Sequence, residues 1–348
     1  MPIWPITAEG MQRRHLPTLP LFLALLAALL FLAIVSLGLG RLNIPPATVA
    51  RIIAGRFVPL IPDWSATWES VIWDVRFPRL MAGILVGGGL AMSGAAFQGI
   101  FRNPLVSPHI LGVSAGAGFG AALGLLFSGH ILVVQAASFC FGVITVAITY
   151  ALSRTYRSSQ MLMLVLSGII VGGFFSALLS LVKYIADPLN KMPAIVFWLL
   201  GSLNNVSNAD LMTTAPIFFS GILGIILVRW RINLLAMGDD DARALGVHTA
   251  RFRGLIIFCA TIITSAAVCI SGIIGWIGLV IPHMGRILVG PDHKILVPVS
   301  AVLGAIFLVL VDLCSRNLLA VEIPIGILTG LIGAPIFAWL LHKNRSGW

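Results

Sequence analysis

The sequence predicts an all-α fold, a polytopic membrane protein with about ten transmembrane helices. Hydrophobic residues make up 59% of its 348 residues and charged residues only 10%, which is not the composition of a soluble domain. Several stretches between charged residues approach the roughly 20 apolar residues that a helix needs to cross a bilayer. The longest candidate for a soluble domain, residues 41–77, is too short to bury a core. We therefore expect one transmembrane domain over residues 1–348.

The gaps between charged residues set the expected spans. Between residues 103 and 153 there is no Asp, Glu, Lys or Arg, and this length suits two helices with a break near residues 128–130. The stretch 254–285 is interrupted at 272–275 (GIIG), which predicts two short spans meeting at a turn. The expected spans are 21–39, 80–101, 110–127, 131–152, 161–182, 211–228, 254–271, 275–290, 295–312 and 323–341.

The positions of Lys and Arg predict the orientation. An even number of spans puts both termini on one side, and a cytoplasmic N-terminus places 14 of the 22 basic residues in the cytoplasm, as the positive-inside rule requires. The chain is thus expected in the cell inner membrane with both termini cytoplasmic. Residues 1–20 carry Arg13 and Arg14 before an apolar run, but this run lacks a small-residue cleavage site, which predicts a retained first span. The net charge of +10 serves orientation, and nucleic-acid binding is excluded because no soluble basic domain exists.

A short loop at residues 102–108 separates two charge-free stretches. Neither Pro104 nor Pro108 can continue a helix, so the loop ends one span and precedes the next. On the helix that follows, glycine recurs at every fourth position, which allows a neighbouring helix to approach backbone to backbone. These glycines are Gly112, Gly116, Gly120 and Gly124.

The densest charge lies at residues 238–253, GDDDARALGVHTARFR. It predicts a short helix outside the membrane over 238–248, with three Asp at the positive N-terminal end and Gly246 ending it. Two interpretations follow: a solvated loop whose charges keep it out of lipid, or a docking helix for a cytoplasmic partner.

No catalytic chemistry is expected on this chain. The phosphate-binding pattern GxxxxGK[ST] is absent from the sequence, and no acid–base pair or nucleophile constellation stands out. His283 follows Pro282 near an expected helix end and is more typical of a structural donor than of a metal ligand. The four cysteines are widely spaced and predicted to be small hydrophobic residues. We therefore expect neither a metal nor a cofactor here.

Five ordered motifs resemble the permease subunits of ABC importers for iron chelates, haem and cobalamin, the FecCD-like type II importers. They are VRFPR at 75–79, GAAFQGIFRNPLVSPHILGVSAGAG at 94–118, GDDDARALG at 238–246, GIIGWIGLVIPHMGR at 272–286 and EIPIGILTGLIGAPIFAWLL at 322–341. The resemblance runs from about residue 76 to residue 341. Two features depart from its usual pattern: Trp276 replaces a common Phe, and the acidic triplet at 239–241 is unusually negative.

The resemblance implies a role for the charged helix and for three arginines. The helix would couple to a separate ATPase subunit that holds ATP and Mg, through Asp239, Asp240, Asp241, Arg243, Ala244, Leu245 and Gly246. Arg76, Arg79 and Arg316 would pair with acidic residues of a periplasmic or extracellular substrate-binding protein, because guanidinium groups engage carboxylates bidentately. The alternative for these arginines is anchoring of helix ends.

The resemblance also implies a gate between two copies of the permease. The gate and pathway residues would be Asn103, Pro104, Leu105, Ser114, Gly116, Ser158 and Ser159. Irregular backbone at membrane depth is tolerated only where protein buries it or water reaches it. A plain proline-stopped connection is the alternative interpretation. Lys183 and Asp187, just past the end of a span, either meet a charged ligand on entry or anchor the helix end.

The expected function is import by ATP-driven alternating access, performed by a permease homodimer with two ATPase subunits and a binding protein. Ferric siderophore is the leading cargo, followed by haem and cobalamin, and a molybdate-type oxyanion is the alternative. A secondary transporter driven by an ion gradient would need ionisable residues within the spans; the candidates are Asp312 and Glu322, both at span ends. A structural scaffold would leave the charged helix unexplained.

Overall fold

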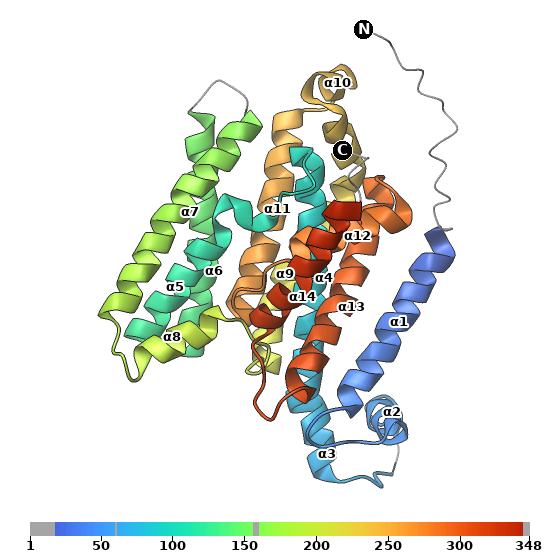
Figure 1. Ribbon diagram of the computed structural model, residues 1–348. Helices are drawn as coiled ribbons and strands as arrows, with labels where there is room; N and C mark the ends of the chain where they lie inside the picture. Colours follow the sequence, from blue (N-terminus) through green and yellow to red (C-terminus); the bar gives the residue numbers. More distant parts are fainter. Residues whose placement is uncertain (1–17, 60, 156–159, 344–348) are drawn as a thin grey trace.

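The computed structural model describes residues 18–59, 61–155 and 160–343, and every regular element within them is helical (Figure 1). The elements in chain order are α1 (Thr18–Gly38), α2 (Pro46–Ala54), α3 (Ala66–Ser70), the π-helical turn η1 (Val71–Arg76), α4 (Phe77–Phe101), the 3₁₀ turn η2 (Pro108–Leu111), α5 (Val113–Phe127), α6 (Ile131–Arg154), α7 (Gln160–Ile185), α8 (Lys191–Leu199), α9 (Asn208–Met237), α10 (Asp239–Ala244), α11 (Thr249–Ser271), α12 (Ile277–Val289), α13 (His293–Asn317) and α14 (Ile325–Lys343).

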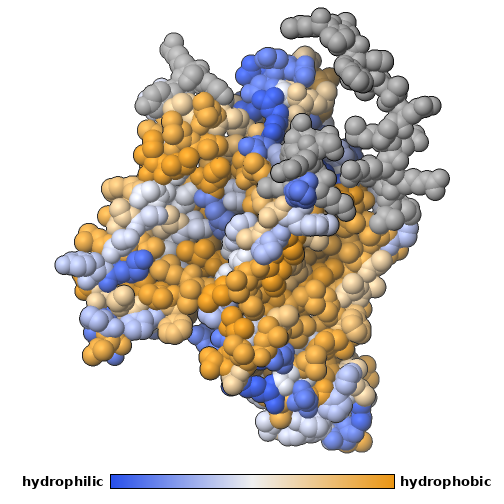
Figure 2. All heavy atoms as spheres, viewed as in Figure 1, coloured by the Kyte–Doolittle hydropathy of each residue, from blue (hydrophilic) through white to orange (hydrophobic). Residues whose placement is uncertain are grey.

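The long helices lie side by side, and the short ones gather at the two ends of the bundle. In Figure 1, α10 lies at one end, while α2, α3 and α8 lie at the other; we call these the α10 end and the α8 end. The same view in Figure 2 shows apolar residues over the middle of the molecule and polar residues concentrated at the ends. This distribution is the one expected for a helical bundle that spans a membrane.

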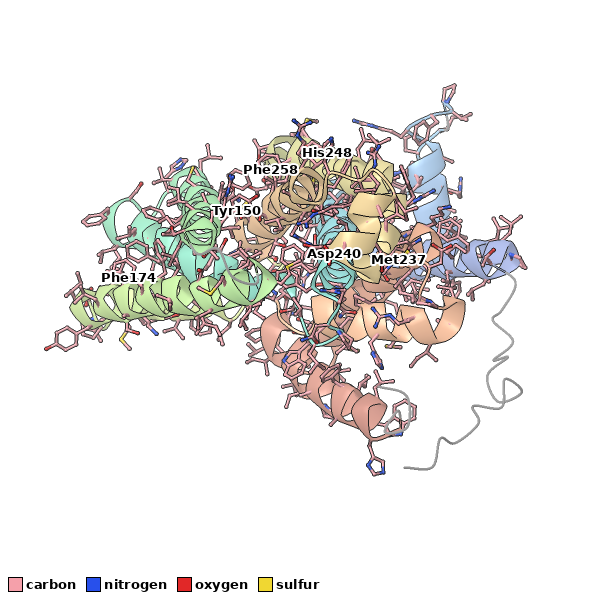
Figure 3. All side chains as sticks on the ribbon, turned by 90° about the horizontal axis from the view of Figure 1, so that it is seen from above. Tyr150, Phe174, Met237, Asp240, His248 and Phe258 are labelled. Carbon is pink, nitrogen blue, oxygen red and sulfur yellow. The ribbon has the colours of Figure 1, made fainter. Side chains whose placement is uncertain are left out.

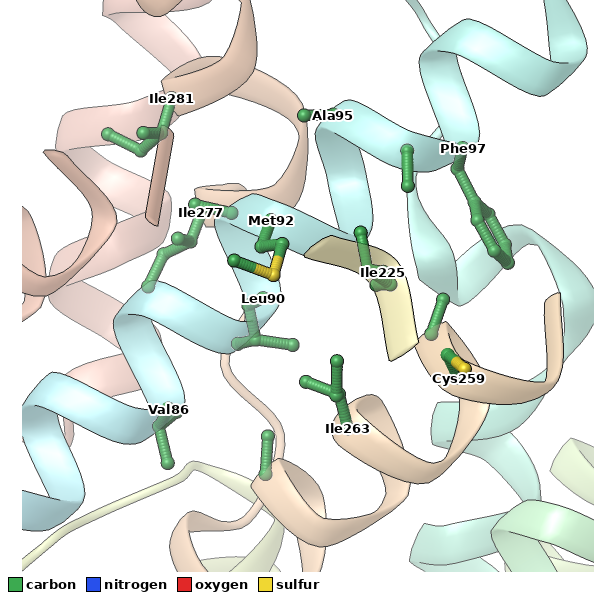
Figure 4. Close-up of a cluster of buried hydrophobic side chains, with 14 of the residues drawn as sticks. Val86, Leu90, Met92, Ala95, Phe97, Ile225, Cys259, Ile263, Ile277 and Ile281 are labelled. Atoms are coloured by element: carbon green, nitrogen blue, oxygen red, sulfur yellow. The ribbon is translucent and has the colours of Figure 1, made fainter. Parts of the chain in front are cut away.

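Helix α4 forms the centre of the core and is buried along nearly its whole length. It packs against α9, α11, α12 and α13, and Figure 4 shows side chains from three of these helices, among them Ile225, Ile263 and Ile277, around Leu90. Glycine allows the closest approach. A Cβ atom at Gly94 would lie 2.0 Å from the carbonyl oxygen of Gly278 in α12. In lipid there is no hydrophobic driving force between helices, so their association depends on close packing. Small residues at the contact permit that packing.

The glycine face predicted on α5 packs against α6. A Cβ atom at Gly120 would lie 2.3 Å from the carbonyl oxygen of Ala137, and one at Gly124 would lie 2.7 Å from the Cα atom of Val134. The close helix contact expected from this pattern is therefore present, and its partner is the next helix of the same chain.

All ten expected spans coincide with helices, but the helices differ in length. Seven of the described helices are long and apolar enough to cross a membrane, counting α3, η1 and α4 as one. The shorter apolar helices are α5, α12 and residues 325–340 of α14. The 13 residues of α12 extend about 20 Å at 1.5 Å per residue, less than the roughly 30 Å of hydrocarbon. The number of complete crossings stays a prediction.

Two regions contain helices that the sequence did not predict. Residues 41–77 were expected to lack a core, yet α2, α3 and η1 form there. Their side chains Val49, Ile52 and Ile72 join Leu37 and Leu80 in a small apolar cluster. The segment thus shares its apolar cluster with α1 and α4. Helix α8 also was not predicted, since its nine residues are too few to span.

Candidate functional site

The short helix expected outside the membrane is α10, and its exposed face is charged. Gly246, just after the helix, has φ of 78°, a left-handed conformation that glycine adopts without strain. Ala242 and Val247 are buried and hold the helix against its neighbours, while Asp240, Arg243 and Leu245 point outward, with Leu245 59% exposed. Asp241, Ala244 and Gly246 are also exposed. The helix and the residue after it thus present the apolar side chains of Ala244 and Leu245 and several charged side chains to solvent.

One ion pair fixes α10 to the bundle. Nη2 of Arg253, on α11, lies 2.5 Å from Oδ1 of Asp239, and only 5% of Arg253 is exposed. Partial burial raises the pKa of Asp239, but the hydrogen bond from Arg253 and the positive charges of Arg253, Arg243 and Arg102 lower it further, so that the net pKa is below its usual value. The carboxylate is therefore charged at neutral pH.

The loop after α4 lies beside α10. A Cβ atom at Gly238 would lie 3.6 Å from Nη1 of Arg102, which ends α4 with φ of 51°. Oδ1 of Asn103 accepts a hydrogen bond of 2.9 Å from the backbone N–H of Leu105, and both residues are exposed. This hydrogen bond holds residues 103–105 in a turn outside any helix. The side chain of Arg102 lies close to Gly238, the residue that precedes α10.

The other predicted gate residues occupy different surroundings. Pro104 is half-buried in the same loop. Ser114 forms a hydrogen bond with His109, and a Cβ atom at Gly116 would clash with Thr145 of α6. Gly116 is thus a packing residue between α5 and α6 in this structure. Ser158 and Ser159 lie outside the described residues.

A buried network of charges lies at the α8 end. Nε of Arg79 lies 2.7 Å from Oδ1 of Asp312, and Nη1 of Arg79 lies 2.9 Å from Oε2 of Glu322. Nε of Arg316 lies 3.2 Å from Oδ2 of Asp312. We call Arg79, Asp312, Arg316 and Glu322 the outer network. It joins α4 to α13 and to the segment before α14.

The three arginines predicted to bind a partner protein are turned inward. Arg79 and Arg316 belong to the outer network. Arg76 is also buried and donates hydrogen bonds of 2.6 and 2.8 Å to the carbonyl oxygens of Leu37 and Gly38 at the end of α1. In this conformation the guanidinium groups are not available to carboxylates of another chain. A docking role for them stays a prediction, and the geometry favours the alternative, anchoring of helix ends.

Three irregular segments meet at the α8 end. The N–H of Ser202 donates to the carbonyl of Ser271 at 2.8 Å, and the N–H of Ile325 donates to the carbonyl of Gly201 at 2.9 Å. The break after α11 falls at Gly272, where φ is 68°, within the GIIG interruption expected from the sequence. Backbone groups that leave a helix inside the bundle are thus satisfied by one another.

A pocket of about 470 Å³ opens at this junction. Buried Gln135 donates a 2.8 Å hydrogen bond to Asp210, which also caps α9 with Ser207. No described Lys or Arg lines the pocket. Its polar lining residues are Gln135, Ser202, Asn204, Asn205, Asp210, Ser271 and Glu322. Sequence reasoning missed this pocket, because its walls come from segments distant in the chain, and only Glu322 was singled out beforehand.

Trp276 begins α12 with φ of 69°, an unusual conformation for a residue with a Cβ atom. It packs against α14, where a Cβ atom at Gly333 would lie 2.6 Å from its own Cβ atom, and its ring faces Phe337 at 6.5 Å between centroids. Trp276 therefore sets the contact between the break and the last helix.

Among the described residues, no three His, Cys, Asp or Glu side chains gather as metal ligands.

The described residues form a bundle of apolar helices with a broken span, a pocket at the break and a charged helix at the opposite end. This is the arrangement expected of a membrane transport permease. The chain belongs to the FecCD transport family, whose model matches residues 28–343.

Relatives and a solved structure agree with this family. "Molybdate import system permease protein MolB" of Haemophilus influenzae is 41% identical over 92% of this chain and 94% of the relative. "Probable iron chelatin transport system permease protein" of Helicobacter pylori is 38% identical over 79% of this chain and 83% of the relative. A solved structure described as an inward-facing metal-chelate type ABC transporter has a TM-score of 0.84 and 40% identity, covering 93% of this chain and 99% of that one.

Proposed function

We propose that this permease imports its cargo by ATP-driven alternating access, as a homodimer. Two ATPase subunits, which carry ATP and Mg, bind at the α10 end, and a substrate-binding protein delivers the cargo at the α8 end. The observation that carries this proposal is the exposed face of α10, with Arg243 and Leu245 available to another chain. Family membership supports it independently.

In this proposal α10 transmits the closing of the ATPase subunits to the gate loop. The Asp239–Arg253 ion pair connects α10 to α11, and Arg102 connects it to the loop that carries Asn103 and Leu105. Both routes are short, so a rigid-body displacement of α10 need not unfold any helix to move the gate. We assign Arg79 and Arg316 of the outer network a structural role: they hold the ends of α4 and α13 together.

We propose a metal chelate as the cargo, with ferric siderophore first and haem or cobalamin next. The pocket at the α8 end is lined by apolar residues such as Phe197 and Trp198 together with amides, hydroxyls and two carboxylates, which suits a large ligand that is partly apolar and has a neutral or cationic polar periphery. The relative named for iron chelatin and the solved metal-chelate transporter support this choice. A pathway must release its cargo, so weak polar contacts are adequate.

A molybdate-type oxyanion is the second candidate, and the relative named for molybdate import supports it. Arg79 is already paired with Glu322 and Asp312, so the pocket offers a dianion no unpaired cation among the described residues, and Asp210 adds a carboxylate to its lining. An oxyanion would therefore pass this region fully hydrated.

The ion-gradient alternative receives little support from the buried carboxylates. Asp312 is held in ion pairs with two arginines of the same chain, which gives it a structural role in this conformation. A proton-coupling site instead needs a group that changes its charge during the cycle.

The test is uptake into proteoliposomes that contain the permease, its ATPase subunit and its binding protein. Ferric siderophore, haem, cobalamin and molybdate are supplied separately, with ATP or a non-hydrolysable analogue inside. We expect uptake of one chelate that requires hydrolysable ATP. Uptake of molybdate alone would replace the cargo proposal, and uptake driven by a proton or sodium gradient without ATP would overturn the function itself.

A further inference from the structure

A cavity of about 370 Å³ at the α10 end is lined by three arginines. It lies between the end of α6 and the start of α11. Arg154 and Arg251 are exposed, and Arg253 is buried. Tyr150 and Ser153 also line the cavity. Arg154 and Arg251 have no role in the transport cycle proposed above, in which Arg253 takes part through its ion pair with Asp239.

Arg253 has unused hydrogen-bonding capacity in this cavity. Its Nη2 atom pairs with Asp239, but its Nε and Nη1 atoms have no hydrogen-bond partner among the described residues. Burying part of a guanidinium group without a partner is costly. Among the described residues, Asp239 pairs with Arg253 and no Asp or Glu lines the cavity. A ligand with negative charge would therefore supply the missing hydrogen-bond partner of Arg253.

An apolar groove of about 340 Å³ continues from the cavity along α6 and α11. Tyr150 and Gly254 line both spaces, so the groove begins where the cavity ends. Figure 3 shows Tyr150 and Phe258 close together on these two helices. Val143, Ala147 and Phe258 line the groove, and Phe258 is largely exposed. This surface lies where the proposed orientation places the acyl chains of the cytoplasmic leaflet.

We propose that the cavity and the groove together bind one anionic phospholipid of the cytoplasmic leaflet. The phosphate lies among Arg154, Arg251 and Arg253, and one acyl chain lies in the groove beside Phe258. Charge complementarity selects a head group with net negative charge, since basic pockets between transmembrane helices bind such head groups. A free phosphate ion would satisfy the arginines but leave the groove empty, so the continuous groove assigns the site to a lipid.

The site adjoins the coupling helix through Arg253, which contacts Asp239 of α10. A lipid phosphate would share this guanidinium group with Asp239 and hold it in place. The anionic lipid is thus a structural support for the surface that the ATPase subunit is proposed to bind. Only the choice of leaflet rests on the proposed function, because lipid binding requires neither ATP nor cargo.

The experiment is a titration of the purified permease in uncharged detergent, followed by native mass spectrometry. Phosphatidylglycerol, phosphatidylcholine and inorganic phosphate are compared. Arg154→Ala and Arg251→Ala remove exposed charges, and Ala147→Trp fills the groove without changing any charge. The matched controls are Arg229→Ala, an arginine of α9 outside the cavity, and Ala136→Trp, an exposed alanine near the other end of α6.

We expect phosphatidylglycerol to bind in preference to phosphatidylcholine. Each arginine substitution should weaken its binding about fivefold, and the two controls should change it by less than about twofold. Ala147→Trp should also weaken binding. Equal binding of both lipids, or binding that ignores Arg154→Ala and Arg251→Ala, would overturn the proposal. Inorganic phosphate that displaces the lipid while Ala147→Trp has no effect would identify a free-anion site instead.

Discussion

The outer network and α10 both contain ion pairs, but the two sets of ion pairs differ in how far they are buried. In the outer network the side chains of Arg79 and Asp312 are 5% and 4% exposed. On α10 the side chains of Arg243 and Asp240 are 62% and 100% exposed and lie 3.5 Å apart. A buried charge requires a partner within the chain, whereas an exposed one can exchange its partner at little cost. Burial therefore separates charges that hold this protein together from charges that can bind another protein.

The largest expected effect tests the buried side of this comparison. Asp312→Ala leaves Arg79 and Arg316 without their shared carboxylate, so we expect the free energy of unfolding to fall by about 3–5 kcal/mol. Unfolding in a denaturing detergent measures it. The control is Asp63→Ala, whose partner Arg51 is half-exposed; its expected cost is below about 1 kcal/mol. Equal costs for the two variants would mean that burial does not distinguish them.

The second prediction concerns the exposed side. Arg243→Ala should reduce ATP-dependent uptake about tenfold or more, as the loss of an interface arginine does. Its unfolding free energy should remain close to that of the wild type, because the ion pair that Arg243 makes with Asp240 among the described residues is exposed to solvent. Uptake in proteoliposomes and unfolding are measured on the same preparation. A variant that loses stability in step with uptake would assign Arg243 a structural role.

A smaller effect is expected at Asp239, whose side chain is 32% exposed and so is intermediate between buried Asp312 and exposed Asp240. Asp239→Asn removes the negative charge that pairs with buried Arg253 and should lower stability by about 1–3 kcal/mol, between the costs of an exposed and a fully buried pair. The pKa of Asp239 is below its usual value of 3.8. The stabilisation is thus complete well above pH 3.8 and is lost as the pH falls through the folded-state pKa. Unfolding curves of wild type and variant should converge in acid, and a constant difference down to pH 2 would contradict the ionic explanation.

The smallest effect is expected at Asp240. Its side chain is fully exposed, so Asp240→Asn should leave thermal unfolding unchanged. Any loss of uptake in this variant would then report contact with the ATPase subunit. A measurable loss of stability would show that the i,i+3 pair with Arg243 contributes to the fold.

The sequence predicted the helical bundle because apolar stretches and glycine spacing are local signals. The break at residues 272–275 and the glycine face of α5 follow directly from residue type. The charged helix was also predictable, since three aspartates and a terminal glycine mark its ends.

The partners of the arginines could not be predicted in this way. Arg79 pairs with Asp312, which lies 233 residues away in the chain, and no local pattern encodes that contact. An arginine at the end of an expected span looks the same whether it points to solvent or into the bundle. The pocket at the α8 end was missed for the same reason, because its walls come together only when α8, α11 and the segment before α14 have packed.

The proposed function depends most on α10 being the contact surface for an ATPase subunit. The most direct test is the affinity of that subunit for the permease, measured for Leu245→Ala and for Leu189→Ala. Both leucines are exposed, but Leu189 lies just before α8 at the opposite end. We predict that Leu245→Ala weakens binding about tenfold while Leu189→Ala leaves it unchanged. Equal affinities for wild type and Leu245→Ala would contradict the account.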